Sequence, residues 1–216
     1  MRHVTALLTV ATVVIFCGSA IGGPTYFGAD WKGAHNEKID GQTGMWGIEG
    51  ASIGEDNYVA GGFLLGQFSY HNENFVRGDI NGKLGHWFSK PFIGADIGYK
   101  IRVYDAPGSD DTTFIHGPMI GVKGFFPLSY FDKEVIKGWD FAPYYVFGYS
   151  PATMKSKSED EPNVSNATAK TIEIGMEITH LKKGLTMKLG YRNEKVSKLG
   201  NSDEELSGLL IQLVFQ

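Results

Sequence analysis

The sequence predicts an all-β fold, a closed antiparallel up-and-down transmembrane β-barrel of about ten strands that follows a signal peptide. Three observations predict it: an apolar N-terminal run, a repeated alternation of apolar and polar residues, and connections that alternate in length. The 216 residues, 42% of them hydrophobic, suit one domain. A net charge of −4 is too small to indicate a nucleic-acid partner.

The N-terminal segment is predicted to be a signal peptide over residues 1–22, which leaves residues 23–216 for the barrel domain. A short basic region precedes the apolar run 6–16, and small residues follow it. A membrane-spanning helix needs about 20 apolar residues, so this run is too short for one. Cys17 is the only cysteine, and it follows a large residue where a lipoprotein would need a small one. Removal of the signal peptide would leave a domain without thiol chemistry.

Alternation with a period of two marks the predicted strands, because successive side chains of a strand point to opposite faces. In the segment 93–103, Ile97 and Tyr99 share an apolar face, whereas Asp96 and Lys100 lie on a polar one. The later segments repeat this division, and the first three alternate less cleanly. In chain order, the predicted strands are 26–32, 44–53, 58–70, 75–88, 91–104, 114–126, 139–150, 169–180, 184–195 and 206–215.

The connections between these segments give independent support. Those that follow odd-numbered strands are polar and mostly long, and most of the others are tight turns. Outer-membrane barrels have short periplasmic turns and longer external loops, and an even strand number places both termini in the periplasm. The external connections are predicted at 35–42, 71–74, 105–113, 151–167 and 197–205, and the periplasmic ones at 54–57, 89–91, 127–137 and 181–184.

Aromatic residues collect near both ends of the predicted strands, as in the two girdles of outer-membrane barrels. We therefore expect a monomer in the bacterial outer membrane, in contact with outer-membrane lipid and lipopolysaccharide. The C-terminal strand is expected to engage the barrel-assembly machinery. The predicted periplasmic girdle contains Phe27, Trp87, Phe88, Phe92, Phe126, Trp139, Phe141 and Phe215, and the outer girdle contains Trp31, Trp46, Tyr70, Tyr104, Phe114, Tyr149 and Tyr191.

The polar faces are predicted to line the lumen with balanced acidic and basic side chains. About eight strands enclose an interior that side chains just fill, whereas wide channels need about 16. A mostly filled lumen excludes a wide general porin and favours ion pairs between strands, since unpaired charges there would be costly. The predicted lumen charge network contains Arg77, Asp79, Lys83, Asp96, Lys100, Arg102, Lys123, Asp140, Glu173, Glu177, Lys188, Arg192 and Glu194, and Asp30, Lys32 and Glu49 lie on the same polar faces.

The mature chain resembles the YfaZ family of bacterial outer-membrane proteins. The resemblance is carried by residues 144–151 (YYVFGYSP) and 185–192 (LTMKLGYR), and more weakly by residues 69–104. It implies a ten-strand outer-membrane barrel of poorly defined function, because these motifs are structural and contain no catalytic signature. Gln216 departs from the family pattern, in which the chain ends on an aromatic residue.

Two alternatives to a structural or narrow-pore barrel remain open. An outer-membrane hydrolase, omptin-like or lipid-modifying, would use His71 or His116 as a general base beside rim carboxylates. A soluble periplasmic lipocalin-like binder would carry its apolar residues inside. The acidic loop 156–163 has ligands for a divalent cation, although a solvated loop is the simpler interpretation. No segment has zinc-ligand or phosphate-loop spacing, so we predict no catalytic site, metal or cofactor.

Overall fold

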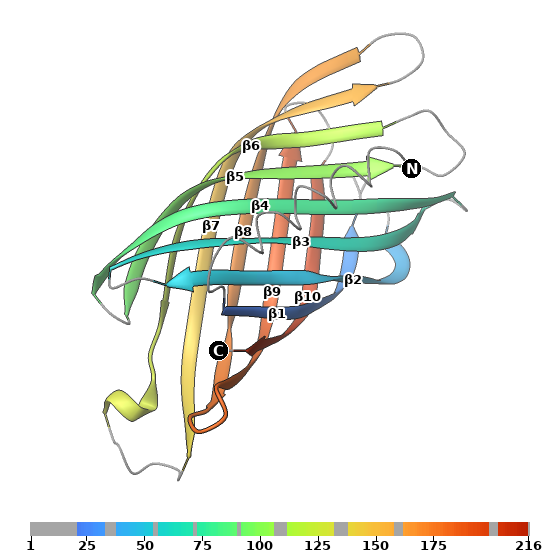
Figure 1. Cartoon of the computed structure of the whole chain (residues 1–216). Helices are drawn as coiled ribbons and strands as arrows, with labels where there is room; N and C mark the ends of the chain where they lie inside the picture. The colour runs from blue at the N-terminus through green and yellow to red at the C-terminus, as the bar shows by residue number, and fades with distance from the viewer. Residues whose placement is uncertain are drawn as a thin grey trace.

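The computed structural model of the chain is a closed barrel of ten antiparallel strands (Figure 1). It describes residues 21–32, 38–53, 56–70, 73–89, 92–105, 112–131, 138–157, 162–198 and 203–215. Residues 1–20, which include most of the predicted signal peptide, lie outside this description. Within the described residues, no helix is long and apolar enough to cross a membrane.

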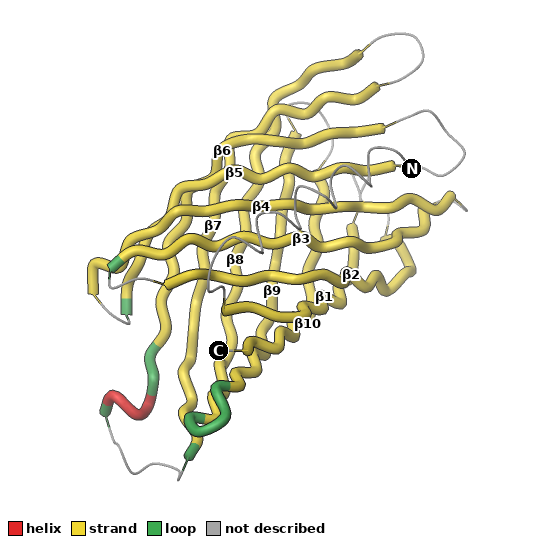
Figure 2. Tube along the Cα trace, viewed as in Figure 1, coloured by secondary structure: helices red, strands yellow, loops and turns green. Residues whose placement is uncertain are grey.

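Each strand pairs with its neighbours in the sequence, and the first strand pairs with the last. One 3₁₀ helix, η1 (Leu128–Tyr130), interrupts the connection between the sixth and seventh strands. Figure 2 shows how little of the described chain is anything but strand. The strands are β1 (Ile21–Lys32), β2 (Lys38–Ile53), β3 (Asn57–Tyr70), β4 (Glu73–Ser89), β5 (Ile93–Asp105), β6 (Thr112–Phe125), β7 (Trp139–Lys157), β8 (Pro162–His180), β9 (Leu185–Lys198) and β10 (Asp203–Phe215).

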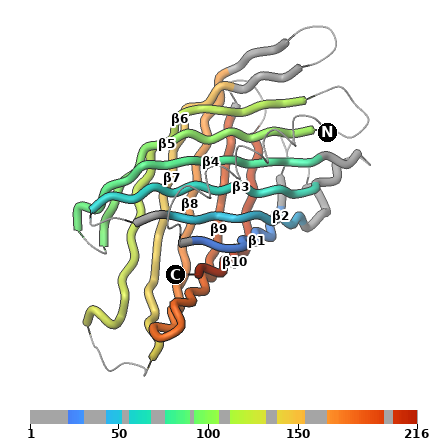
Figure 3. The backbone as a smooth tube through the Cα atoms, in the orientation of Figure 1, coloured from blue at the N-terminus to red at the C-terminus, as the bar shows by residue number. Residues whose placement is uncertain are grey.

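Closure of the barrel depends on the β1–β10 ladder. It pairs Thr25 with Gln212 and continues to the pair of Lys32 and Glu205. A strand at the edge of an open sheet exposes unpaired backbone groups, and closure removes that edge. In Figure 3 the colour changes steadily from strand to strand around the wall, as this chain order requires. The predicted ten-strand closed antiparallel barrel is confirmed.

The two faces of the wall differ as the alternation predicted. On β5, Ile97 points outward and is 65% exposed, whereas its neighbour Asp96 is buried inside. Leu84 on β4 and Ile174 on β8 are likewise exposed on the outside. An apolar outer face around a charged interior is the reverse of what the lipocalin-like alternative requires.

The interior also contains apolar side chains. Phe27 and Leu210 belong to a buried cluster on the inner faces of β1, β2, β3 and β10. Phe27 was predicted to lie in the periplasmic girdle, and so was Trp87, which instead packs inside the barrel against Tyr58 and Phe125. Both predictions are wrong. Phe27 and Trp87 continue an alternation in which every second side chain points inward, and this alternation decides which face a side chain lies on more strongly than its position at a strand end.

The hairpin of β7 and β8 is longer than predicted. Most of the connection expected at 151–167 is strand, since the ladder continues to the pair of Lys157 and Pro162. A polar sequence therefore does not prevent strand pairing in this hairpin. Pro118 and Pro151 lie where the β6–β7 ladder is interrupted, which suits residues without a backbone N–H, and Ser150 Oγ donates to the Pro118 carbonyl at 2.6 Å.

Replacing Leu210 with Ala is expected to lower the free energy of unfolding by about 2–5 kcal/mol, because it leaves a cavity in a packed interior. Leu210 is 1% exposed, whereas Leu209 points outward and is 52% exposed. Leu209→Ala is therefore the matched control and should cost much less. Urea unfolding of both variants in detergent micelles provides the comparison, and equal losses would show that the faces of β10 are wrongly assigned.

Candidate functional site

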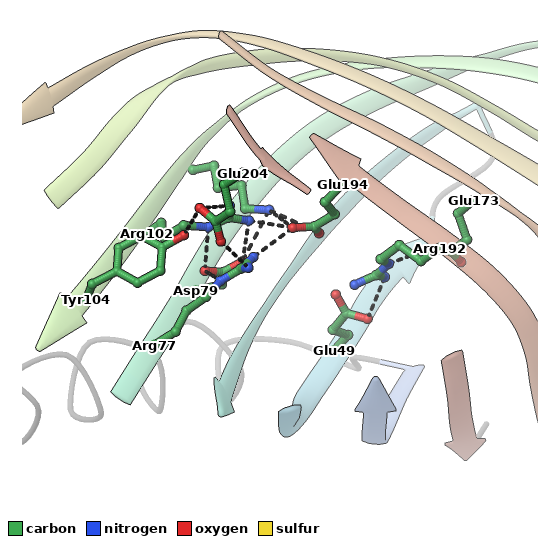
Figure 4. A network of polar contacts seen from close by, with 10 residues as sticks. Glu49, Arg77, Asp79, Arg102, Tyr104, Glu173, Arg192, Glu194 and Glu204 are labelled. Atoms are coloured by element: carbon green, nitrogen blue, oxygen red, sulfur yellow. Dashed lines mark hydrogen bonds and ion pairs between the residues drawn. The ribbon is translucent and has the colours of Figure 1, made fainter. Parts of the chain in front are cut away.

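The lumen holds its largest group of charges where β4 and β5 face β9 and β10. Arg77 and Asp79 stand two residues apart on β4, so both point inward. The β4–β5 ladder pairs Arg77 with Tyr104 and Asp79 with Arg102. Glu194 on β9 and Glu204 on β10 reach the same group from the opposite wall (Figure 4).

Arg77 is the centre of this group, and its side chain is fully buried. Its Nε donates to Asp79 Oδ1 at 3.0 Å and its Nη2 to Asp79 Oδ2 at 2.7 Å. The same Nη2 donates to Glu194 Oε2 at 2.8 Å, and Nη1 donates to Glu204 Oε1 at 3.3 Å. One guanidinium therefore joins a carboxylate of its own strand to carboxylates from two distant strands.

Arg102 and Lys100 on β5 complete the group. Arg102 donates to both oxygens of Asp79 at 2.9 Å and also to Glu194. Lys100 Nζ lies 3.3 Å from Asp79 Oδ2 and 3.3 Å from Glu194 Oε1. Tyr104 OH donates to Glu204. We call Arg77, Asp79, Lys100, Arg102, Tyr104, Glu194 and Glu204 the central network.

The central network is electrically neutral, because its three basic and three acidic side chains balance. Moving a charge out of water costs several kcal/mol, and only close, well-oriented opposite charges offset that cost. The bidentate contacts of Arg77 and Arg102 with Asp79 are of the strong kind. The arrangement can fix the two walls of the barrel relative to each other without leaving an uncompensated buried charge.

Three further ion pairs, in two groups, lie elsewhere in the lumen. Arg192 Nε donates to Glu173 Oε2 at 2.8 Å, and its Nη2 lies 3.4 Å from Glu49 Oε2 on the other side (Figure 4). Lys188 Nζ lies 3.2 Å from Glu177 Oε1 on the neighbouring strand. Most of the residues predicted for the lumen network are thus brought together in these three groups.

Four of the predicted lumen residues lie outside these groups. Lys123 Nζ lies 3.4 Å from the centre of the Tyr58 ring. Asp96 accepts a hydrogen bond from Tyr58 OH at 2.8 Å. Lys83 is paired in register with Gly98 of β5. Asp140 instead binds η1 at the end of the barrel. It accepts hydrogen bonds from the backbone N–H and the Oγ of Ser129 at 3.1 and 2.6 Å.

Sequence reasoning missed Glu204 and Tyr104. Glu204 was assigned to the external connection, although it continues the inward alternation of Leu206 and Leu210. Tyr104 was assigned to the outer girdle, which is wrong, because its hydroxyl group reaches Glu204 inside the lumen. The available signal was its spacing of two residues from Arg102, which places both on one face.

Of the two histidines of the hydrolase hypothesis, the structure describes His116 alone. His71 and the acidic residues Glu159, Asp160 and Glu161 lie outside the described residues. His116 alternates with the buried Ile115 and therefore points outward, where its Nδ1 lies 2.6 Å from Tyr99 OH. Among the residues that the structure describes, no group of three possible ligands is placed to hold a metal ion.

Comparisons with known proteins find similarity only among solved structures. No protein-family model and no curated protein sequence matches the chain, so the resemblance to the YfaZ family stays a prediction.

Several solved structures match across nearly all of both chains, and three such structures are bacterial outer-membrane β-barrels. The β domain of the Bordetella autotransporter BrkA is 10% identical with a TM-score of 0.46, covering 92% of this chain and 100% of its own. Neisserial surface protein A is 10% identical with a TM-score of 0.37 (92% and 98% covered). Ail, the attachment invasion locus protein of Yersinia pestis, is 13% identical with a TM-score of 0.35 (91% and 97% covered).

Replacing Asp79 with Asn should destabilise the barrel by about 3–5 kcal/mol, because three buried basic side chains would lose a shared carboxylate. Asp203→Asn is the control, since Asp203 pairs with Lys195 at 2.8 Å on the exposed surface, where such pairs contribute little. Urea unfolding in micelles measures both. A similarly small loss for the two variants would contradict a structural role for the central network.

Proposed function

We propose that the chain is a small, sealed outer-membrane barrel with a structural role, whose lumen does not pass solutes from end to end. The observation that carries this proposal is the central network, in which Arg77 is 0% exposed and binds carboxylates from both sides of the lumen. A conducting path would need water to pass this level. The charged groups of the central network bind each other rather than water.

The outer face supports a bilayer as the surroundings of this barrel. Large apolar side chains are exposed on strands all around the wall, and exposing so much contiguous apolar surface to water would be unfavourable. In hydrocarbon the same surface is well solvated, and a closed barrel exposes no strand edge to lipid. The exposed residues include Trp46, Leu84, Phe88, Ile97, Ile120, Phe147, Ile174, Tyr191, Leu209 and Phe215.

The orientation in the membrane follows from the connections. The start of β1 and the end of β10 lie at the same end of the barrel as the short β8–β9 turn (residues 181–184). Short turns and chain termini face the periplasm in outer-membrane barrels. We propose that the long hairpin of β7 and β8 points to the cell exterior, beside lipopolysaccharide, and that the barrel is a monomer assembled through its C-terminal strand.

Wild-type protein reconstituted in planar bilayers is expected to show no stepwise conductance. The paired replacement of Arg77 and Asp79 by Ala keeps the lumen neutral while removing its central contacts, and it should produce small conductance steps. Slower migration of the boiled sample on a gel would verify that both proteins are folded barrels. Regular steps from the folded wild-type protein would overturn the sealed lumen.

The orientation of the wall is tested with single cysteines in a Cys17→Ser background. Ile97→Cys should react with a maleimide that is dissolved in the lipid phase, because Ile97 is exposed on the outer face. Lys188→Cys should not, since Lys188 points into the lumen and pairs with Glu177. Mass spectrometry after labelling gives the two extents. Preferential labelling at position 188 would exclude a membrane barrel.

A further inference from the structure

The connection between β6 and β7 carries aromatic side chains beyond the end of the barrel wall. η1 lies in this connection, and Figure 1 shows it at the lower left, past the ends of β4 and β5. The centroid of the Tyr130 ring is 5.2 Å from that of Phe92, at the start of β5, and the Phe131 centroid is 6.3 Å from it. Tyr130 and Phe131 are nevertheless 63% and 69% exposed. Most of the surface of these two residues therefore faces the surroundings of the barrel.

This aromatic surface is continuous with the outer face of the wall. Phe92 lies 5.4 Å from Phe126, centroid to centroid, and its carbonyl accepts a hydrogen bond from Tyr145 OH at 3.0 Å. The Tyr145 ring lies 6.1 Å from Phe126 and 5.8 Å from Phe147, which is exposed on the outside of β7. An unbroken row of ring contacts thus leads from the outer face of the wall to η1. We call this set the aromatic row, which consists of Phe92, Phe126, Tyr130, Phe131, Tyr145 and Phe147.

Hydrogen bonds hold η1 against the wall. Asp140, at the start of β7, accepts bonds from the backbone N–H and the Oγ of Ser129 at 3.1 and 2.6 Å. The Phe126 N–H donates to the Pro143 carbonyl at 2.8 Å, so the chain stays bonded to β7 almost to the start of η1. The exposed rings of η1 therefore stand on a fixed support.

The aromatic row ends where the boundary between hydrocarbon and headgroups is expected. Its connection lies at the end of the barrel with the short β8–β9 turn, because the Leu181 N–H donates to the Gly138 carbonyl at 3.0 Å. A contiguous exposed apolar surface is unfavourable in water, whereas aromatic rings favour the membrane boundary, where a Tyr hydroxyl group still meets water. A protein that covered the row would have to displace lipid from Phe126, Tyr145 and Phe147. Continuity with the wall thus favours phospholipid as the occupant.

We propose that η1 is a membrane anchor, in which Tyr130 and Phe131 insert into the headgroup boundary of the adjacent phospholipid leaflet while Asp140 positions them. This inference rests on the proposed function, because it requires a barrel in a bilayer. A girdle lies on the strands themselves, whereas this anchor lies on a connection and extends the lipid contact past them. The anchor therefore fixes how deeply this end of the barrel is immersed. Segments bound at this boundary lie about 5–10 Å into it.

Fluorescence quenching in phosphatidylcholine vesicles measures this immersion. The full-length folded chain, in the Cys17→Ser background, carries Phe131→Cys with an environment-sensitive fluorophore at this exposed position. A nitroxide near the headgroup end of the acyl chains should quench the label several-fold more than one near the methyl end, and aqueous iodide should quench it weakly. Lys182→Cys is the matched control, because Lys182 is exposed on the β8–β9 turn at the same end of the barrel. Its label should show strong iodide quenching instead.

Asp140→Ala, added to the Phe131→Cys chain, tests the support of η1. It should raise iodide quenching several-fold, because both bonds to Ser129 are lost, and slower migration after boiling verifies that the barrel is folded. Asp203→Ala removes an exposed ion pair with Lys195 and should leave the quenching unchanged. Equal quenching in the two variants would overturn the positioning role of Asp140.

Two outcomes overturn the anchor itself. Iodide quenching at position 131 as strong as at position 182 would place η1 in water. Protection at position 131 from iodide and from both nitroxides would assign the aromatic row to a protein contact.

Ile97→Cys, labelled in the same way, separates this inference from the proposed function, because Ile97 is exposed on the outer face of the wall. An Ile97 label that lipid nitroxides quench, together with a label at position 131 that stays in water, refutes the anchor alone. An Ile97 label that no nitroxide quenches refutes the membrane barrel.

Discussion

The structure depends on one constraint: a narrow closed wall turns the charged side chains of many strands into one interior, where the most deeply buried charges must be paired. Closure of β1 on β10 removes all edges from the ladder but also brings alternate side chains of ten strands into one interior. The central network meets this constraint through Arg77, whose guanidinium binds carboxylates on β4, β9 and β10. The apolar outer face is the other consequence, because the same alternation that collects charges inside turns the remaining residues outward.

The strands of the barrel wall could be predicted from the sequence better than the contacts between side chains inside the lumen. A period of two was enough to assign the faces of β5, where Ile97 lies outside and Arg102 inside. It was not enough to pair Arg77 with Glu204, because that contact depends on which strands face each other across the lumen, and no local pattern encodes this. Phe27 and Trp87 were assigned to the wrong face because their position near a strand end was given more weight than the alternation of side chains along the strand. The long β7–β8 hairpin was missed because its sequence is as polar as a loop.

The interior is divided into regions of different character. The central network is dry and neutral, apolar clusters around Phe27 and Ile115 fill neighbouring space, and Lys188 and Glu177 pair in a more exposed part of the lumen. Each region is defined by the pairing or packing of a few inward residues.

Arg77 and Glu204 are separated by 127 positions in the chain. Their contact can form only once the strands on both sides of the barrel are in place. A slip of one residue in the pairing of β4 would turn Arg77 and Asp79 toward lipid, where charged groups are strongly disfavoured. The central network therefore favours the correct register energetically, because an incomplete or misregistered barrel carries exposed or unmatched charges and the correct arrangement removes that penalty.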